Sequence, residues 1–258
     1  MSTVPQLRRL CSLAILVLLC VVAQVNRGWA GAQVVLFDQA HGQRFVIEEK
    51  GPLHLSGLAE RFRTAGYTVQ SSSATLTDLT LAGIDVLVIS GPFATLTNEE
   101  TAAVTHFLDK GGRLAAMLHI GPPLADLLHR LDVDFSNYVL SEQENIIKGD
   151  PRNFRVKGLT PHPLFGGMDQ FSLYGGWALM NTGGNAGIIA ATTPRAWVDL
   201  DGNRQLSAGD PVQSFGVVVA GNWGNGRFVI FGDDAIFQNQ FLDEANGTLA
   251  DNLANWLR

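Results

Sequence analysis

The chain has 258 residues, of which 46% are hydrophobic and 16% are charged, and its formal net charge is −6 at pH 7. This composition is typical of a folded globular protein with a sizeable core and excludes an intrinsically disordered chain. The acidic balance argues against a nucleic-acid partner.

The first thirty residues have the pattern of a secretory signal peptide. Arg8-Arg9 precedes an apolar run at 10–25, and Gly28-Trp29-Ala30 offers a small-x-small cleavage site. The apolar run has 16 residues, whereas a membrane-spanning helix usually needs roughly 20, which disfavours the alternative of an uncleaved anchor. We therefore expect a periplasmic or extracellular protein, cleaved after residues 1–30, that would contact a membrane only through an uncleaved leader.

Cleavage of this leader would limit the chemistry of the mature chain. Cys11 and Cys20 are the only cysteines, and both lie in the leader. The leader also carries three arginines and no acidic residue, so the net charge of the remainder falls to −9. The mature chain would have no disulfide, no thiolate metal ligand and no cysteine nucleophile.

Strand and helix signals alternate along the first half of the mature chain. Apolar runs predict strands at 34–37, 67–70, 84–89 and 113–118, and helices are expected at 53–65, 97–110 and 122–131. Thr97 and Glu100 form a capping box, and Gly66 closes the first helix. This alternation implies a parallel sheet with helices on both faces.

The second half is less regular. We expect an extended segment at 139–147, further strands at 171–177 and 187–191 near an edge of the sheet, and a final helix at 248–257. A turn at 224–226 predicts a hairpin between 214–220 and 227–231. Asn246 begins a glycosylation sequon, which we interpret as a helix cap. The sequence predicts one α/β domain over residues 31–258, a three-layer sandwich around a mostly parallel sheet of flavodoxin-like or amidotransferase-like type.

Polar residues follow four of the apolar runs directly. Ligands bind at the carboxyl ends of the strands in open α/β sheets, so we expect these residues to face one crevice. The predicted ligand-binding residues are Asp38, His41, Arg44, Ser90, Gly91, His119, Asp233 and Asp234.

Two interpretations of these residues stay open. Asp38, His41, His119 and Asp233 could form an acid/base or metal-binding cluster. Alternatively, the two aspartates cap backbone N–H groups and the histidines donate to carbonyls in tight turns, an interpretation that we favour. A hydrolase triad built on Ser90 is disfavoured because no G-x-S-x-G motif surrounds it.

Arg44 also admits two interpretations. Its guanidinium would suit an anionic ligand, because the fork of N–H groups matches a carboxylate or phosphate. A surface ion pair with Glu48 or Glu49 is the simpler account.

A separate stretch has the oxygen-ligand spacing of a calcium loop. Oxygen-bearing side chains occupy loop positions 1, 3, 5, 7, 9 and 12, and the candidate ligands are Asp199, Asp201, Asn203, Gln205, Ser207 and Asp210. The pattern resembles the EF-hand or dockerin-type loop, except that Arg204 stands at position 6, where glycine is usual, and the last ligand is aspartate. A metal-free turn rich in Asp, Gly and Asn is the alternative; calcium, if bound, would be structural.

The order of the motifs resembles that of a known superfamily. The strand followed by Asp38-x-x-His41, the Gly111-Gly112-Arg113 strand ending at His119, the His162-Pro163 pair and the final strand before Asp233 are similar to the class I glutamine-amidotransferase-like superfamily. Within it, the chain resembles an uncharacterised secreted branch related to gliding-motility transporter auxiliary proteins and to an intraflagellar transport subunit. It resembles ThuA-like proteins more distantly.

The resemblance implies a function as well as a fold. True amidotransferases carry a cysteine on a tight turn whose nearest counterpart here is His119-Ile120-Gly121, so glutamine hydrolysis by that mechanism is not expected. We expect a non-catalytic binding or accessory domain that recognises a small molecule or an envelope protein and is associated with a transporter. The alternative is a hydrolase or lyase acting on a small polar or carbohydrate substrate, with His41 or His119 as base and Asp38 or Asp233 orienting it.

Overall fold

The computed structural model describes residues 32–258, so the predicted leader lies outside the described residues. Residues 33–258 form one compact unit. In chain order the strands and helices are β1 (Val34–Asp38), α2 (Ser56–Thr64), β2 (Thr68–Ser72), β3 (Val86–Ser90), α3 (Asn98–Asp109), β4 (Arg113–Met117), α4 (Ala125–Arg130), β5 (Val133–Ser141), β6 (Ile146–Ile147), β7 (Asp150–Val156), β8 (Gly158–Leu159), β9 (Phe171–Tyr174), β10 (Trp177–Asn181), β11 (Ala186–Ala191), β12 (Trp197–Val198), β13 (Gly216–Trp223), β14 (Gly226–Phe231) and α5 (Glu244–Trp256). No helix in this range is long and apolar enough to cross a membrane.

One large sheet contains eleven strands and has two differently built halves. Its main path runs β12-β5-β10-β13-β14-β4-β3-β1-β2, with β11 and β8 attached through β13. The five strands β2, β1, β3, β4 and β14 pair in parallel, which confirms the predicted α/β core. The other six pair antiparallel, so the prediction of a mostly parallel sheet was only partly right.

The switch from parallel to antiparallel pairing has a local cause. The chain reverses between β13 and β14 through a tight turn in which Trp223 pairs with Gly226 and Gly224 has a φ of 56°. Glycine adopts this left-handed backbone without steric cost. The hairpin predicted at 224–226 is therefore confirmed, and every strand beyond β13 on that side continues antiparallel.

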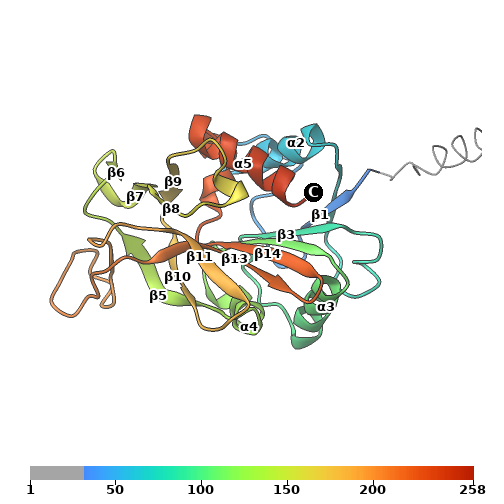
Figure 1. Ribbon diagram of the computed structural model, residues 1–258, viewed down its shortest axis with the longest axis horizontal. Helices are drawn as coiled ribbons and strands as arrows, with labels where there is room; N and C mark the ends of the chain where they lie inside the picture. Colours follow the sequence, from blue (N-terminus) through green and yellow to red (C-terminus); the bar gives the residue numbers. More distant parts are fainter. Residues whose placement is uncertain (1–31) are drawn as a thin grey trace, which may run out of the picture. The chain divides into compact units, whose positions relative to one another are not determined.

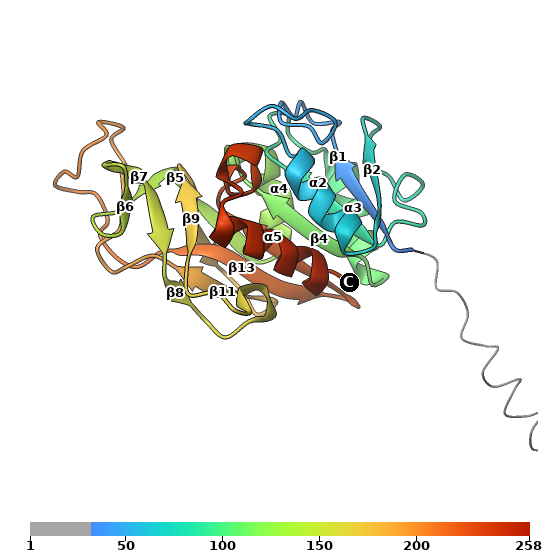
Figure 2. The same cartoon turned by 90° about the horizontal axis from the view of Figure 1, so that it is seen from above.

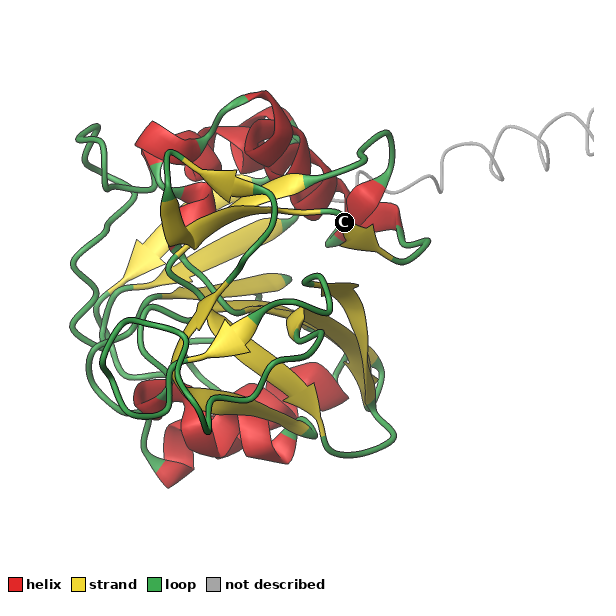
Figure 3. Ribbon diagram, turned by 90° about the vertical axis from the view of Figure 1, so that its left-hand side faces the viewer, coloured by secondary structure: helices red, strands yellow, loops and turns green. Residues whose placement is uncertain are grey.

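Helices cover both faces of the parallel half of the sheet (Figures 1 and 3). Phe62 of α2 and Leu253 of α5 pack in one apolar cluster with Val35, whereas Leu108 of α3 and Leu128 of α4 pack in the other. A three-layer sandwich is not established for the antiparallel half, where the small sheet β6-β7-β9 packs on the face that carries α5. Residues 142–174 carry turn residues rather than a helical apolar stripe, so no α-helix forms there and the only helical turn is the 3-10 helix Pro163–Phe165.

The register of the parallel strands brings their ends together. Ser90 of β3 and Phe231 of β14 both align with Met117 of β4, and Phe37 of β1 aligns with Val88. All four strands therefore finish at the same edge, and the strand order reverses between β1 and β3. In open α/β sheets such a reversal is the usual place for a ligand. We call the residues that follow these strand ends the carboxyl edge.

Two of the predicted helix-end signals are confirmed. Thr97 and Glu100 form both hydrogen bonds of the capping box, and Gly66 follows α2 with a φ of 91°. The strand predicted at 171–177 was wrong in detail. It splits into β9 and β10 at Gly175, whose φ is 81°, and β10 lies inside the large sheet between β5 and β13 rather than at its edge.

Asn246 joins α5 to two other segments from a fully buried position. Its side chain accepts from the backbone N of Ser172 at 2.8 Å and donates to the carbonyls of Ser172 and Ile236, both at 3.1 Å. The N-cap of α5 is Asp243, which accepts from the backbone N of Asn246 at 2.9 Å. The interpretation of Asn246 as the cap was therefore wrong by three residues.

Asn246→Ala tests how strongly this junction contributes to stability. The change leaves three buried backbone groups without their partner, and each such group costs about 1–3 kcal/mol, so we expect a loss of roughly 3 kcal/mol or more. Denaturant unfolding measures it. Asn255→Ala, at an exposed position of the same helix, is the matched control. Equal denaturation midpoints for Asn246→Ala and Asn255→Ala would contradict the role of Asn246 in joining these segments.

Candidate functional site

Of the two predicted site histidines at the carboxyl edge, His119 has the more exposed ring. Its Nδ1 lies 3.0 Å from Oδ1 of Asp234, whose side chain is 2% exposed, whereas the His119 side chain is 35% exposed. The backbone fixes this pair, because the N of Asp234 donates to the carbonyl of Leu118 at 2.9 Å. No described residue bonds Nε2 of His119. One ring nitrogen is therefore held by a buried carboxylate and the other is left for a ligand.

The charges around this ring favour its protonated form. The hydrogen bond to Asp234 raises the pKa of His119, while burial and the Arg44 charge oppose the rise. Burial also raises the pKa of Asp234, and burial together with the Asp234 carboxylate raises the pKa of Asp233 to about 8. The charge of this site is therefore set by three groups, the two adjacent buried acids and the imidazole that Asp234 contacts.

Two phenylalanine rings contact the imidazole of His119. The ring centroids of Phe93 and Phe45 lie 4.9 Å and 5.3 Å from that of His119. The indole Nε1 of Trp177 donates to the His119 carbonyl at 3.1 Å. Arg44 is exposed and lies over Phe93, with its Cζ 4.5 Å from the ring centroid. No ion pair of Arg44 with Glu48 or Glu49 forms among the described residues.

No side chain fits at Gly91, which lies against Asp234 and His119. Its φ is 56°, and an added Cβ would overlap Oδ2 of Asp234 and lie 3.3 Å from the Cβ of His119. Ser90, which precedes it, is 4% exposed, and its hydroxyl has no hydrogen-bond partner in the described chain; the same holds for Oδ2 of Asp234. No base among residues 32–258 contacts the Ser90 hydroxyl, so these residues form no Ser-His-Asp triad around it.

His41 belongs to a second, closed cluster. It is 4% exposed, and its two ring nitrogens lie 2.7 Å from Oδ2 of Asp38 and 3.0 Å from Oε1 of Glu100. Glu100 also accepts from the backbone N–H groups of Thr97 and Leu76. Burial lowers the pKa of His41, but its two carboxylate partners outweigh this and raise it. Because both nitrogens are occupied, His41 ties the loop after β1 to α3 and offers no free atom to a ligand.

The two neighbouring aspartates after β14 have different partners. Asp233 accepts from the backbone N–H groups of Tyr174 at 2.6 Å and Ala235 at 2.8 Å. His41 pairs with Asp38, as the sequence allowed, whereas the partner of His119 is Asp234 and neither Asp38 nor Asp233. Sequence reasoning had also assigned Glu100 only to a helix cap; nothing local signals its bond to His41, which is 59 residues away in the chain.

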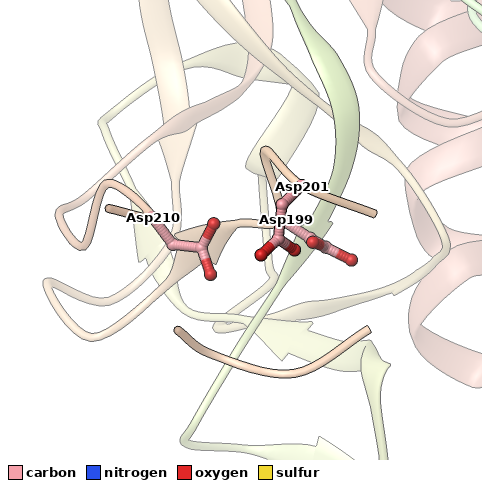
Figure 4. Close-up of side chains that lie close together, drawn as sticks. All are labelled: Asp199, Asp201 and Asp210. Atoms are coloured by element: carbon pink, nitrogen blue, oxygen red, sulfur yellow. The ribbon is translucent and has the colours of Figure 1, made fainter. Parts of the chain in front are cut away.

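The predicted calcium loop brings its acidic side chains together. One carboxylate oxygen each from Asp199, Asp201 and Asp210 lies within 4.8 Å of the others, and Asp210 faces the other two across the loop (Figure 4). Arg204 has a φ of 62°, so it adopts the left-handed backbone for which glycine is usual at position 6. The departure noted in the sequence therefore does not prevent the sharp turn.

The other candidate ligands of this loop bond within it. The side-chain oxygen of Asn203 accepts from the backbone N of Gln205 at 2.7 Å, and the hydroxyl of Ser207 donates to Asp210 at 3.0 Å and Asp201 at 3.2 Å. Asp199 accepts from the backbone N–H groups of Asn203 and Arg204. These bonds satisfy polar groups within the loop, and the three carboxylates that a cation would need still lie close together.

Comparison with known proteins supports the fold. The chain is similar to the mmIFT52 N-terminal domain, with 18% identity and a TM-score of 0.69 over 86% of this chain and 96% of that one. It is similar to cytoplasmic protein STM1381 from Salmonella typhimurium LT2 (15%, TM-score 0.58, 88% and 99%) and to a ThuA-like protein from Bacteroides uniformis ATCC 8492 (14%, TM-score 0.52, 90% and 94%). At these identities the likeness shows the fold alone.

These neighbours agree with part of the resemblance stated from the sequence. The relation to ThuA-like proteins and to an intraflagellar transport subunit is confirmed at the level of the fold, whereas the assignment to a secreted branch is not. No curated protein matches the chain. A family model described as "Domain of unknown function (DUF4350)" matches residues 48–254, and the chain therefore belongs to this family.

Proposed function

We propose that this protein is an exported, non-catalytic binding module of the cell envelope, an accessory to a transporter or another envelope assembly, whose ligand binds at the carboxyl edge beside His119. The observation that carries the proposal is the way in which the His119 ring is held and exposed. One nitrogen is fixed by buried Asp234, and the partly exposed ring contacts two phenylalanines. Export rests on the leader pattern of residues 1–30.

Three features favour binding over catalysis. Residues 32–258 contain no cysteine, the Ser90 hydroxyl has no base in contact, and both nitrogens of His41 bond to buried carboxylates. Nucleophilic catalysis needs a nucleophile within hydrogen-bond reach of a base. At the carboxyl edge, the imidazole of His119 is held in place by Asp234, but no nucleophile among the described residues lies within reach of it.

The chemistry of the site favours a small organic anion. His119 keeps its proton to a higher pH than a free histidine because Asp234 stabilises the imidazolium. Arg44, whose charge acts on His119, adds a second cation with a fork of N–H donors. Phe45 and Phe93 supply apolar rings that contact the imidazole. Charged donors with apolar walls are the usual composition of a small-ligand site.

A hydrolase or lyase is the second candidate, and the His119–Asp234 pair is the observation that favours it. A histidine oriented by a buried carboxylate is a general base or acid in many enzymes. In this alternative Asp234, rather than Asp38 or Asp233, would orient the ring. A substrate screen separates the two functions, because only the enzyme would turn over a compound with loss of turnover in His119→Ala.

His119→Ala tests the proposed binding function. In NMR-detected titrations with a panel of small carboxylic acids, we expect the best ligand to lose about 10- to 100-fold in affinity, because hydrogen bonds to charged groups contribute about 1.5–3 kcal/mol. Affinity of the unaltered protein should be full above the carboxyl pKa of the ligand, about 4, and fall as the pH rises through the raised pKa of His119. His129→Ala, at an exposed position of α4, is the control. Equal affinity for the two variants, or no pH dependence, would contradict the proposal.

We also propose that the loop from Asp199 to Asp210 binds calcium as a structural ion. The convergence of three carboxylates and the left-handed backbone at Arg204 support this proposal. Only three of the six candidate ligands are acidic, and calcium affinity rises with the charge of the ligand set, so we expect a weak site with a Kd of about 10⁻⁴–10⁻³ M, as in extracellular modules.

Calcium titration checks this site. At 10 mM calcium, a site of that affinity would stabilise the fold by roughly 1.5–3 kcal/mol, which raises Tm by several degrees relative to chelator. Asp201→Asn should abolish the rise, and Asp126→Asn, on exposed α4 surface, should retain it. No calorimetric heat and an unchanged Tm would show that the loop is metal-free.

A further inference from the structure

A cavity of about 480 Å³ lies outside the carboxyl edge and shares no lining residue with it. Three segments line it: β5 at Tyr138, the start of β7 at Pro151 and Arg152, and the loop at Gly202 and Arg204. Figures 1 and 2 show this loop, in orange, at the end of the sheet away from β1 and β2. A cavity of this volume is within the range of small-molecule sites.

Exposed apolar residues lie on two of the segments that line the cavity. Eight large hydrophobic residues of the described chain are well exposed. One of them, Tyr138, lines the cavity, and two others, Leu200 and Leu206, lie on the loop that contributes Gly202 and Arg204 to its wall, with exposures of 44% to 47%. Exposed apolar side chains gathered at one place mark binding surfaces, whereas single ones do not.

The cavity also has one cation without an ion-pair partner. Arg152 is neutralised by Asp150 through two bonds, from Nε at 3.0 Å and Nη2 at 2.8 Å. Arg204 forms no ion pair with any described residue, and its backbone is held in place, since its N donates to Oδ2 of Asp199 at 2.7 Å. The left-handed conformation of Arg204 is uncommon for a side chain of this size. Asp199 also lines the cavity, but its carboxylate accepts from the backbone N–H groups of Asn203 and Arg204. Arg204 is therefore the one guanidinium of this lining that has no ion pair among the described residues.

We propose that this cavity is a second ligand site, which takes a small molecule with a flat apolar body and one anionic group. The exposed Tyr138 ring and Pro151 would contact the body, and Arg204 would pair with the anion, since its planar fork matches carboxylates and sulfonates. The site is independent of His119, so the module would bind two ligands at separate places. The proposal does not depend on calcium, although the loop that would hold the ion forms one wall.

The fluorescent probe 1-anilinonaphthalene-8-sulfonate tests the site, because it joins a flat aromatic body to a sulfonate. We expect saturable binding with one dominant site, weakened at least fivefold in Arg204→Asn and in Tyr138→Ala. Asparagine is chosen at position 204 because it tolerates the left-handed backbone better than most residues, so the loop keeps its shape. Arg130→Gln, at an exposed arginine of α4, is the matched control and should bind as the unaltered protein does.

Each other result overturns the proposal. Non-saturable fluorescence would mean surface adsorption only, and unchanged binding in Arg204→Asn would remove the assigned anion partner. Loss of binding in His119→Ala but not in Arg204→Asn would place the probe at the carboxyl edge. Amide shifts on probe addition give a second readout, and they should centre on Gly202 and Tyr138. Failure of the His119 titrations leaves these expectations unaffected, because the two sites share no residue.

Discussion

The parallel alignment of β1, β3, β4 and β14 is the constraint on which the carboxyl edge depends. Parallel strands end together, so residues distant in the chain follow their ends at one edge of the sheet. His119 and Asp234 are 115 residues apart, and they meet because β4 and β14 are neighbours in register. Antiparallel pairing of these two strands would place the imidazole and its carboxylate at opposite edges.

Burial then assigns different roles to two histidines that look alike in the sequence. His41 lies between Asp38 and Glu100 with both nitrogens occupied, so its hydrogen bonds fasten a loop to α3. His119 has one buried carboxylate partner and a partly exposed ring. The family match and the structural neighbours assign no activity, so this difference in exposure carries the functional argument.

Much of the parallel half could be predicted from the sequence, because its signals are local: buried apolar runs, the capping box at Thr97 and the glycine after α2. The antiparallel half was predicted poorly, since the partners of β5 and β10 are set by long-range packing and no local signal marks them. The set of strand-end residues followed from topology, but the pairing of His119 with Asp234 did not. The choice between Asp233 and Asp234 depends on which carboxylate caps the backbone of Tyr174, and no sequence pattern reports that.

The pKa of His119 in the unaltered protein and in Asp234→Asn, measured by NMR of the imidazole nitrogens, tests the central claim most directly. The account predicts a pKa above the ordinary histidine value in the unaltered protein and a clear fall in Asp234→Asn, with His41 unchanged, because only His119 contacts Asp234. A His119 pKa at or below the ordinary value, or one that does not respond to the loss of the Asp234 charge, would contradict it.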